Sequence, residues 1–272
     1  FRLRLNMKDI KIIIATHTQY FMPSDDMYLP LHVGKSGKEE LGYQGDDAGD
    51  NISLNNPNFC ELTGLYWAWK NLPNDYLGLI HYRRFFSVKN CAERKKNPLE
   101  TLYLTREEAS QLLSQYDVIV PSKRNYYIET LYSHYANTLH AEHLDVTREI
   151  IAEKCGEFLG SFDAVMKQRG GYMFNMFIMS KELVNDYCSW LFPILFELEK
   201  RIPAEQYSVF HARFYGRVSE LLFNVWLKQY SQSKLLTVKA IPFVYGEKIN
   251  WLKKGTAFLM AKFFGKKYEK SF

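Results

Sequence analysis

Apolar segments of strand length alternate with amphipathic segments of helix length along most of this chain. Residues 8–15 (KDIKIIIA) are rich in β-branched side chains and predict the buried first strand of a parallel sheet. Further strands are predicted at 76–86, 116–120, 172–179 and 236–244. Helices are predicted at 61–71, 107–115, 126–155, 181–200 and from about 205 or 213 to 230. This order predicts an α/β fold with a mainly parallel sheet flanked by helices.

One long polar segment, 18–58, interrupts the pattern. It contains five glycines and a cluster of acidic residues, Asp46, Asp47 and Asp50. A connection of this length is uncommon in a compact domain unless it has a function. We therefore expect a functional loop that contains short elements.

Composition and charge divide the chain in two. With 272 residues, of which 47% are hydrophobic, it has material for one large α/β domain, which we assign to 7–250. The segment 251–272 contains six lysines and one glutamate, so it carries the whole net charge of +5 and leaves residues 1–250 neutral. A neutral body argues against nucleic-acid binding, and the basic, aromatic tail predicts contact with an anionic membrane surface. Residues 1–6 precede Met7 and are interpreted as a remnant of an expression vector.

Two further features bear on location. The four cysteines have no metal-ligand spacing and are interpreted as reduced cytosolic thiols, although four cysteines also allow two disulfides. No apolar run reaches the roughly 18 residues that a membrane-spanning helix needs. Together they predict a cytoplasmic protein that is peripheral at the inner face of the cell membrane.

The most informative segment is 78–86, GLIHYRRFF. Its apolar residues predict a strand whose C-terminal end carries His81, Tyr82, Arg83 and Arg84. In open α/β sheets ligands bind beyond the carboxyl ends of the strands. Two adjacent guanidinium groups at such a place match the oxygens of a nucleoside diphosphate.

Strand geometry limits this interpretation. Residues of an extended strand alternate between its faces, so Arg83 and Arg84 reach one ligand only if the strand has ended by Arg83. The alternative is an ion pair between these arginines and the acidic cluster at 46–50.

Three segments carry a resemblance to a known family. The strings ELTGLYWAWKN, DYLGLIHYRRFF and YMFNMFIMSKE resemble the capsular and exopolysaccharide biosynthesis proteins that were long classed as a domain of unknown function. The resemblance covers the chain from Met7 to about Gly246. It implies a glycosyltransferase of GT-A-like, Rossmann-type architecture, and members of the family have been linked to galactosyl or galactofuranosyl transfer.

The chain departs from the usual GT-A pattern in its metal site. Such enzymes commonly hold a divalent cation with an Asp-x-Asp pair, and this sequence contains none. Arginines could replace the metal in stabilising the departing nucleoside diphosphate. We therefore expect that no metal cofactor is required, although Asp46, Asp47 and Asp50 leave a divalent cation open.

Nucleoside contacts are predicted at the end of the first strand and in the acidic loop. The candidates are Thr16 and His17, together with Asp50 and Asn51. The alternative for the loop is a turn followed by a helix cap, because Asp and Asn favour both without any ligand.

Sugar contacts are predicted at two places in the C-terminal half. Asn175 stands in a predicted apolar strand, where its amide needs a hydrogen-bond partner, and the resemblance favours a sugar contact over a bond to a neighbouring loop. Arg217 and Glu220 are three residues apart and share one face of a predicted helix. Glu220 would act as general base or orient the donor, unless the two only pair with each other.

Other chemistries have less support. His140 and His143 could share a metal at i, i+3 but have no third ligand at good spacing. They and His134 are therefore interpreted as surface or acceptor-groove residues. The chain has no G-x-S-x-G, G-x-G-x-x-G or P-loop motif, which argues against hydrolase, dehydrogenase and kinase classes.

The sequence thus predicts a hexosyltransferase that moves galactose, as pyranose or furanose, from a UDP-sugar to a lipid-linked glycan. Arg83, Arg84 and His81 would stabilise the leaving group. The competing hypothesis is a non-catalytic nucleotide- or glycan-binding subunit of a polysaccharide assembly complex.

Overall fold

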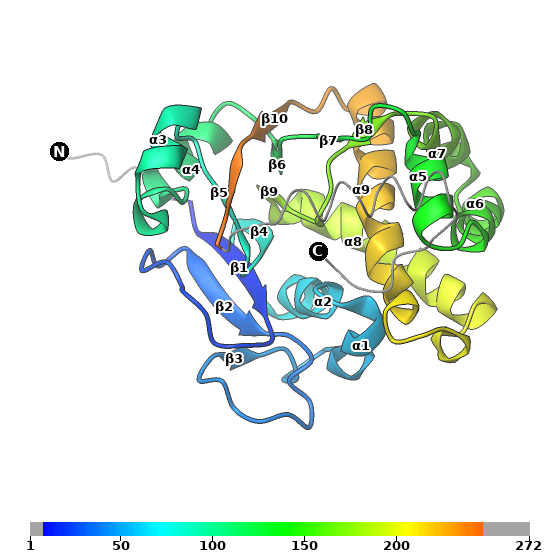
Figure 1. The fold of residues 1–272 in the computed structure, drawn as a ribbon, viewed down its shortest axis with the longest axis horizontal. Helices are drawn as coiled ribbons and strands as arrows, with labels where there is room; N and C mark the ends of the chain where they lie inside the picture. The colour runs from blue at the N-terminus through cyan, green and yellow to red at the C-terminus, as the bar shows by residue number, and fades with distance from the viewer. Residues whose placement is uncertain (1–7, 247–272) are drawn as a thin grey trace.

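A computed structural model describes residues 8–246, and a central sheet organises this region (Figure 1). The predictions for residues 1–6 and for the tail at 251–272 fall outside the described residues. Along the sheet the strands follow the order β10 (Val238–Ile241), β6 (Val118–Pro121), β9 (Phe177–Ser180), β4 (Tyr76–His81), β1 (Ile10–Thr16), β2 (Tyr28–His32) and β3 (Gln44–Gly45). Strand β9 is antiparallel to β4 and β6, and the other neighbours on this path are parallel. The predicted mainly parallel α/β sheet is confirmed.

Helices cover both faces of this sheet. The α-helices are α1 (Asn56–Phe59), α2 (Leu62–Asn71), α3 (Cys91–Lys96), α4 (Arg106–Leu113), α5 (Leu131–Thr138), α6 (Glu142–Lys154), α7 (Leu159–Met166), α8 (Lys181–Arg201) and α9 (Phe214–Ser233). Short 3-10 helices are η1 (Ser53–Asn55), η2 (Leu99–Thr101), η3 (Gly156–Phe158), η4 (Ala204–Gln206) and η5 (His211–Arg213). Ile13 packs in the core with α2, α8 and α9, whereas Ile12 and Ile14 pack in the core with α4. Because both faces are covered, β1 is a continuous apolar run.

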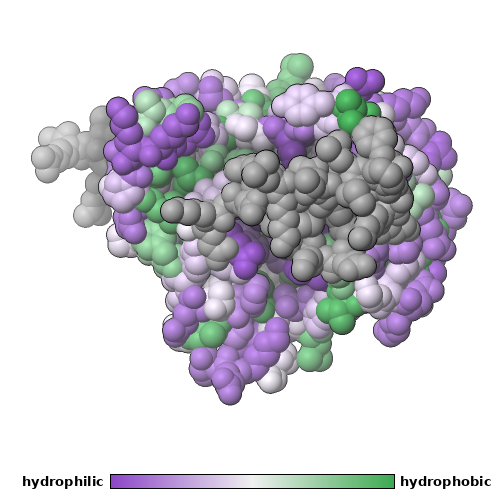
Figure 2. Space-filling view, viewed as in Figure 1, coloured by the Kyte–Doolittle hydropathy of each residue, from purple (hydrophilic) through white to green (hydrophobic). Residues whose placement is uncertain are grey.

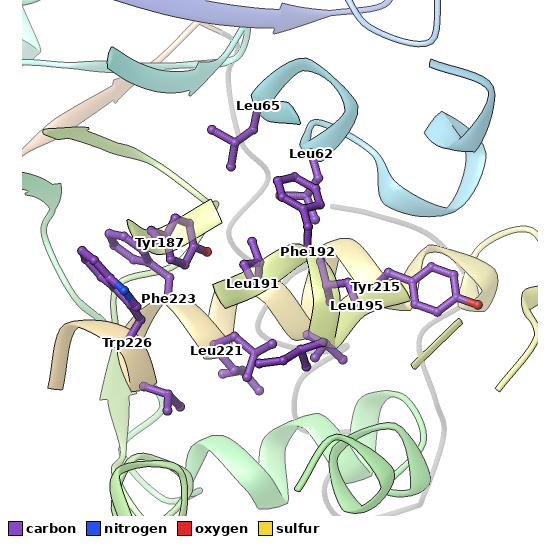
Figure 3. Close-up of a cluster of buried hydrophobic side chains, with 14 of the residues drawn as sticks. Leu62, Leu65, Tyr187, Leu191, Phe192, Leu195, Tyr215, Leu221, Phe223 and Trp226 are labelled. Atoms are coloured by element: carbon purple, nitrogen blue, oxygen red, sulfur yellow. The ribbon is translucent and has the colours of Figure 1, made fainter. Parts of the chain in front are cut away.

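Helix α9 is the most deeply buried support of the C-terminal half. It packs against α1, α7 and α8, and Figure 3 shows Phe223 and Trp226 of α9 near Tyr187 of α8. Each fully buried side chain of this size contributes about 1.5–3 kcal/mol relative to exposure. The helix is therefore a rigid platform for the polar residues that it carries.

Three predicted elements differ in detail. The strand at 76–86 divides into β4 and β5 (Arg84–Phe86), which pairs with β11 (Phe243–Tyr245). The strand at 236–244 divides into β10 and β11 at Pro242, which has no N–H for a ladder. The helix predicted at 126–155 is two helices, α5 and α6, preceded by β7 (Arg124–Asn125), which pairs with β8 (Gly170–Gly171).

The strand predicted at 172–179 begins only at Phe177, so placing Asn175 inside a strand was wrong. Phe174 and Asn175 have φ angles of 76° and 53° and form a turn. Left-handed backbone at two consecutive non-glycine residues is strained, and surrounding contacts must hold it.

On the face of the molecule in Figure 2, hydrophilic residues dominate the periphery and hydrophobic ones form small groups. Within residues 8–246, no helix is both long enough and apolar enough to cross a membrane.

Candidate active site

A cavity of about 710 Å³ opens at the C-terminal ends of β1 and β4. Its walls come from the β4–β5 turn, from the residues just after β1, and from α5, η5 and α9. This volume lies within the roughly 300–1,000 Å³ of small-molecule sites. The position beyond strand ends is where ligands bind in open α/β sheets.

The turn between β4 and β5 brings two arginines to one ligand site. Strand β4 ends at His81, which pairs directly with Arg84 across a tight turn, and the backbone N–H of Arg83 donates to Nδ1 of His81 at 3.3 Å. Both arginines line the cavity. Strand β4 has ended before Arg83, which lies in the turn, so the two arginines are not held on opposite faces of one extended strand. This is the condition under which both can reach one ligand. Tyr82 is buried beneath the turn, with its ring edge-to-face with His17 at 5.4 Å.

Cationic side chains dominate the cavity wall. The described residues place five arginines there, Arg83, Arg84, Arg124, Arg213 and Arg217, and the same wall contains Glu61 and Glu220. The arginines come from the β4–β5 turn, β7, η5 and α9. Such an excess of like charge is costly to desolvate without an anion, so the wall is suited to an anionic ligand.

Two of these guanidinium groups keep unused donors. Nε of Arg84 and Nη1 of Arg217 are buried and have no hydrogen-bond partner within the described part of the chain. Each guanidinium lies over an aromatic ring instead, Arg84 at 4.1 Å from the centre of Phe174 and Arg217 at 3.9 Å from that of Phe210. The aromatic rings hold the planes of the guanidinium groups while leaving their N–H groups for a ligand.

The histidines of the cavity are neutral at physiological pH. Burial, helped by Arg84 and Arg83, lowers the pKa of His81 to about 3. The pKa of His17 is lowered as well, by desolvation and by Arg83 and Arg213. Because His81 Nδ1 accepts from Arg83, the neutral ring carries its proton on Nε2 and can donate it to a ligand oxygen.

Glu220 lies partly buried in the cavity wall, and no ion pair joins it to Arg217 within residues 8–246, although its charge acts on Arg217 electrostatically. The alternative of a simple Arg217–Glu220 pair is therefore wrong. Burial raises the pKa of Glu220, and Glu61 adds to the rise, whereas a hydrogen bond from the backbone of Phe174 and the charge of Arg84 oppose it. The carboxylate is thus held among cations at the wall, available to a hydroxyl group.

Asn175 lies behind the wall rather than in it. Its amide nitrogen donates to Oε1 of Glu61 at 2.8 Å and to the carbonyl of Gly216 at 3.0 Å. Its oxygen accepts from the Ser219 hydroxyl at 2.9 Å. Asn175 is 3% exposed and does not line the cavity. These bonds fix the Phe174 turn onto α9 and orient Glu61, which matches the structural alternative of the sequence.

Among the predicted nucleoside contacts, His17 lines the cavity, whereas Thr16, Asp50 and Asn51 do not. The Thr16 hydroxyl is buried and donates to the carbonyl of Thr18 at 2.6 Å. Asn51 donates to the carbonyls of Asp47 and Gly49 and accepts from the N–H of Ser53. In this structure the acidic loop has the contacts of a turn, whereas the 3-10 helix that follows it, η1, has no side-chain cap.

Asp46, in the same loop, is buried and accepts four hydrogen bonds. The donors are the N–H groups of Gly34 (2.8 Å) and Lys35 (3.0 Å) and the hydroxyls of Ser53 and Thr63. It does not supply the ion pair for the β4–β5 arginines that the sequence had left open.

Sequence reasoning missed several residues of the wall. Arg124, Arg213 and Tyr135 had no role assigned to them, and Glu61 was noted only as the first residue of a predicted helix. His134, which had been interpreted as a surface or acceptor-groove residue, does line the cavity. Nε of Arg213 donates to Sγ of Cys60 at 3.1 Å. The one available signal was position, since charged residues at the ends of buried elements require a partner. Within residues 8–246, no three His, Cys, Asp or Glu side chains form a group that could hold a metal ion.

Comparison with known proteins places the chain in a family. A family model described as "Domain of unknown function (DUF4422)" matches residues 11–232. The chain belongs to this family. Among solved structures, the WbbM bifunctional glycosyltransferase in its apo form is similar over 88% of this chain, with 30% sequence identity and a TM-score of 0.79. This chain covers 45% of the length of that protein. A search of curated proteins found no match to this chain.

Proposed function

We propose that this DUF4422 chain is a glycosyltransferase whose cavity binds a nucleotide-activated sugar. The observation that carries the proposal is the convergence of five arginines around the cavity, two of them with buried donors that have no partner within residues 8–246. A nucleoside diphosphate supplies the anionic oxygens that these donors lack. The similarity to a bifunctional glycosyltransferase supports the same reaction class.

The β4–β5 turn would hold the diphosphate. When the bond to the sugar breaks, negative charge develops on the departing phosphate, and donors that are already aimed at it need no reorganisation. Arg83 and Arg84 would supply that stabilisation and His81 would donate from its neutral ring, with no metal cofactor required. We expect a UDP-hexose as donor, with galactose in its pyranose or furanose form as the first candidate.

The opposite wall would receive the sugar and the acceptor. Arg217 and Glu220 lie on α9, which is anchored in the core and ties the Phe174 turn in place. Glu220 would accept a hydrogen bond from a sugar hydroxyl, and so orient the donor, or act as general base. The acceptor would be a lipid-linked glycan in capsular, exopolysaccharide or O-antigen synthesis, met at the anionic cytoplasmic membrane surface through residues 251–272.

Isothermal titration with UDP, followed by measurement of UDP release from UDP-galactopyranose and UDP-galactofuranose, tests the proposal. We expect binding that depends on the cavity arginines and release of UDP as turnover proceeds. Binding without any release with either donor would favour the non-catalytic subunit. Absence of UDP binding would refute a UDP-sugar transferase and leave only the glycan-binding form of the competing hypothesis.

Removal of divalent cations with EDTA tests whether arginines or a metal ion neutralise the charge of the diphosphate. If arginines hold the diphosphate, excess EDTA should change UDP release by less than about twofold, because no ion has to bridge the phosphates. Complete loss with EDTA and recovery with Mn²⁺ or Mg²⁺ would show that a cation is part of the site. A parallel titration of UDP with and without EDTA separates effects on binding from effects on turnover.

A further inference from the structure

A histidine–carboxylate pair stands in the α5 wall of the cavity, apart from the arginine-bearing turn. Nδ1 of His134 lies 2.9 Å from Oε2 of Glu129. His134 lines the cavity, whereas Glu129 is 2% exposed and does not. The carboxylate therefore lies behind the ring. A carboxylate at Nδ1 fixes the tautomer of a neutral histidine, so the proton is on Nδ1 and the lone pair on Nε2.

The surrounding contacts hold this pair in one geometry. Glu129 also accepts from the amide of Asn137 at 2.6 Å. The ring of His134 stacks on Tyr126, with 4.0 Å between ring centroids. Thr130 begins α5 with a capping box to Ser133, which fixes the first turn that carries His134. A side chain clamped by a second layer of bonds in this way is positioned as a reacting group needs to be.

We infer that His134, oriented by Glu129, is the base that takes the proton from the acceptor hydroxyl in the proposed glycosyl transfer, on which this inference rests. The acceptor oxygen bonds to the anomeric carbon while the bond from that carbon to the diphosphate oxygen breaks. The electron pair of the broken bond leaves with the nucleoside diphosphate. The hydroxyl proton passes to Nε2 of His134 and from there to water.

The charges around His134 couple the base to the donor. Burial lowers its pKa to about 4, and Arg124 contributes to the lowering, while Glu129 opposes it. A nucleoside diphosphate bound among the arginines would offset the charge of Arg124, which raises the pKa of His134 toward the working pH.

This assignment leaves Glu220 with a different task. Arg84 and Arg124 act electrostatically on Glu220, and the backbone of Phe174 donates a hydrogen bond to it. These contacts suit a carboxylate that holds the donor sugar. His134 stands on α5 with Leu131 and Tyr135, which give the cavity an apolar and aromatic wall suited to the face of an acceptor sugar.

The test is UDP release and transfer with UDP-galactopyranose and UDP-galactofuranose, with octyl galactoside as the acceptor probe. His134→Gln keeps a donor for Glu129 but removes the base, so kcat should fall by about 10²-fold or more while the Kd for UDP changes less than about twofold. His134→Ala should lose as much and regain at least about tenfold when imidazole is added. Glu129→Gln should show a smaller loss that imidazole does not relieve.

The matched control is His140→Ala, since His140 bonds His211 and does not line the cavity. It should keep kcat within about twofold. Normal transfer by His134→Gln would overturn the inference alone. Loss of UDP affinity in step with kcat, without rescue by imidazole, would also overturn it, because a structural role behaves in that way. A wild-type protein that neither binds UDP nor releases it from either donor would overturn the proposed function itself.

Discussion

Two polar regions of this molecule use their hydrogen-bonding groups in opposite ways. In the acidic loop, Asp46 accepts four hydrogen bonds from groups of its own neighbourhood. In the cavity, Arg84 and Arg217 keep buried donors without partners in residues 8–246. Both regions are polar, contain several charges and looked like ligand sites in the sequence.

The difference shows what separates a structural network from a binding site. A buried polar group without a partner costs about 1–3 kcal/mol, so a fold keeps such groups only where something else compensates. In the loop, the compensation is internal and the network stabilises the fold. In the cavity, the described residues offer these guanidinium groups aromatic rings but no hydrogen-bond acceptor for the two donors, which fits the proposed anionic ligand. Substitutions in the loop and in the cavity test this difference.

The largest effect is expected in the loop. Asp46→Ala would leave two buried N–H groups and two hydroxyls without their acceptor, so the free energy of unfolding should fall by at least about 3 kcal/mol. Urea denaturation measures this as a lower midpoint at unchanged slope. Asp47→Ala, at an exposed neighbour, should stay within about 0.5 kcal/mol. Equal stability of the two variants would show that the Asp46 network does not hold the loop.

In the cavity, substitution of an arginine should weaken the binding of UDP rather than lower the stability of the fold. Arg84→Ala should weaken UDP binding by about 1.5–3 kcal/mol, the value of hydrogen bonds to charged groups, and Arg83→Ala should act in the same direction. The fold should not lose stability when Arg84 is removed, because a buried donor without a partner goes with it. Titration calorimetry measures the affinity.

Arg148→Ala is the control for these arginine variants. Arg148 forms an exposed ion pair with Asp163 and does not line the cavity, so Arg148→Ala should leave UDP affinity unchanged. If both Arg83→Ala and Arg84→Ala bind UDP as the wild type does, the cavity does not recognise a diphosphate.

A pH effect should also come from the cavity. The folded protein lowers the pKa of His81 to about 3, whereas in the unfolded chain it is about 6.5. Between these values the unfolded state binds the extra proton, so stability falls as pH falls, by up to about 1.4 kcal/mol per pH unit. His81→Gln should flatten the dependence of unfolding free energy on pH between 4 and 6. Parallel curves for the two proteins would contradict the buried, neutral ring.

The smallest effect is expected at Asn51. Its three local hydrogen bonds hold a turn, so Asn51→Ala should cost about 0.5–1.5 kcal/mol of stability. Its Kd for UDP should change less than about twofold. A tenfold loss of UDP affinity would mean that the loop reaches the nucleoside, as its sequence had suggested, and the separation of the two regions would fail.

The elements that could be predicted from sequence are those with strong local signals. The β-branched run of β1 and the amphipathic α2, α8 and α9 follow from periodicity, which local residues decide. The turn at Phe174 and Asn175 could not be predicted, because its left-handed backbone depends on bonds to Glu61, Gly216 and Ser219. Those partners lie far away along the chain.

For the candidate site, the sequence by itself predicted that His81, Tyr82, Arg83 and Arg84 lie at the ligand site, because a charged cluster at the end of a buried strand can be recognised from adjacent residues. It also determined the family. Only the tertiary structure decided that Arg124, Arg213 and Arg217 join Arg83 and Arg84 around one cavity, and that Asp50 and Asn51 lie outside it. The physical reason is that the sum of charges in a cavity depends on which distant segments the sheet and helices bring together, whereas the bonds of Asn51 join residues only two to four positions apart.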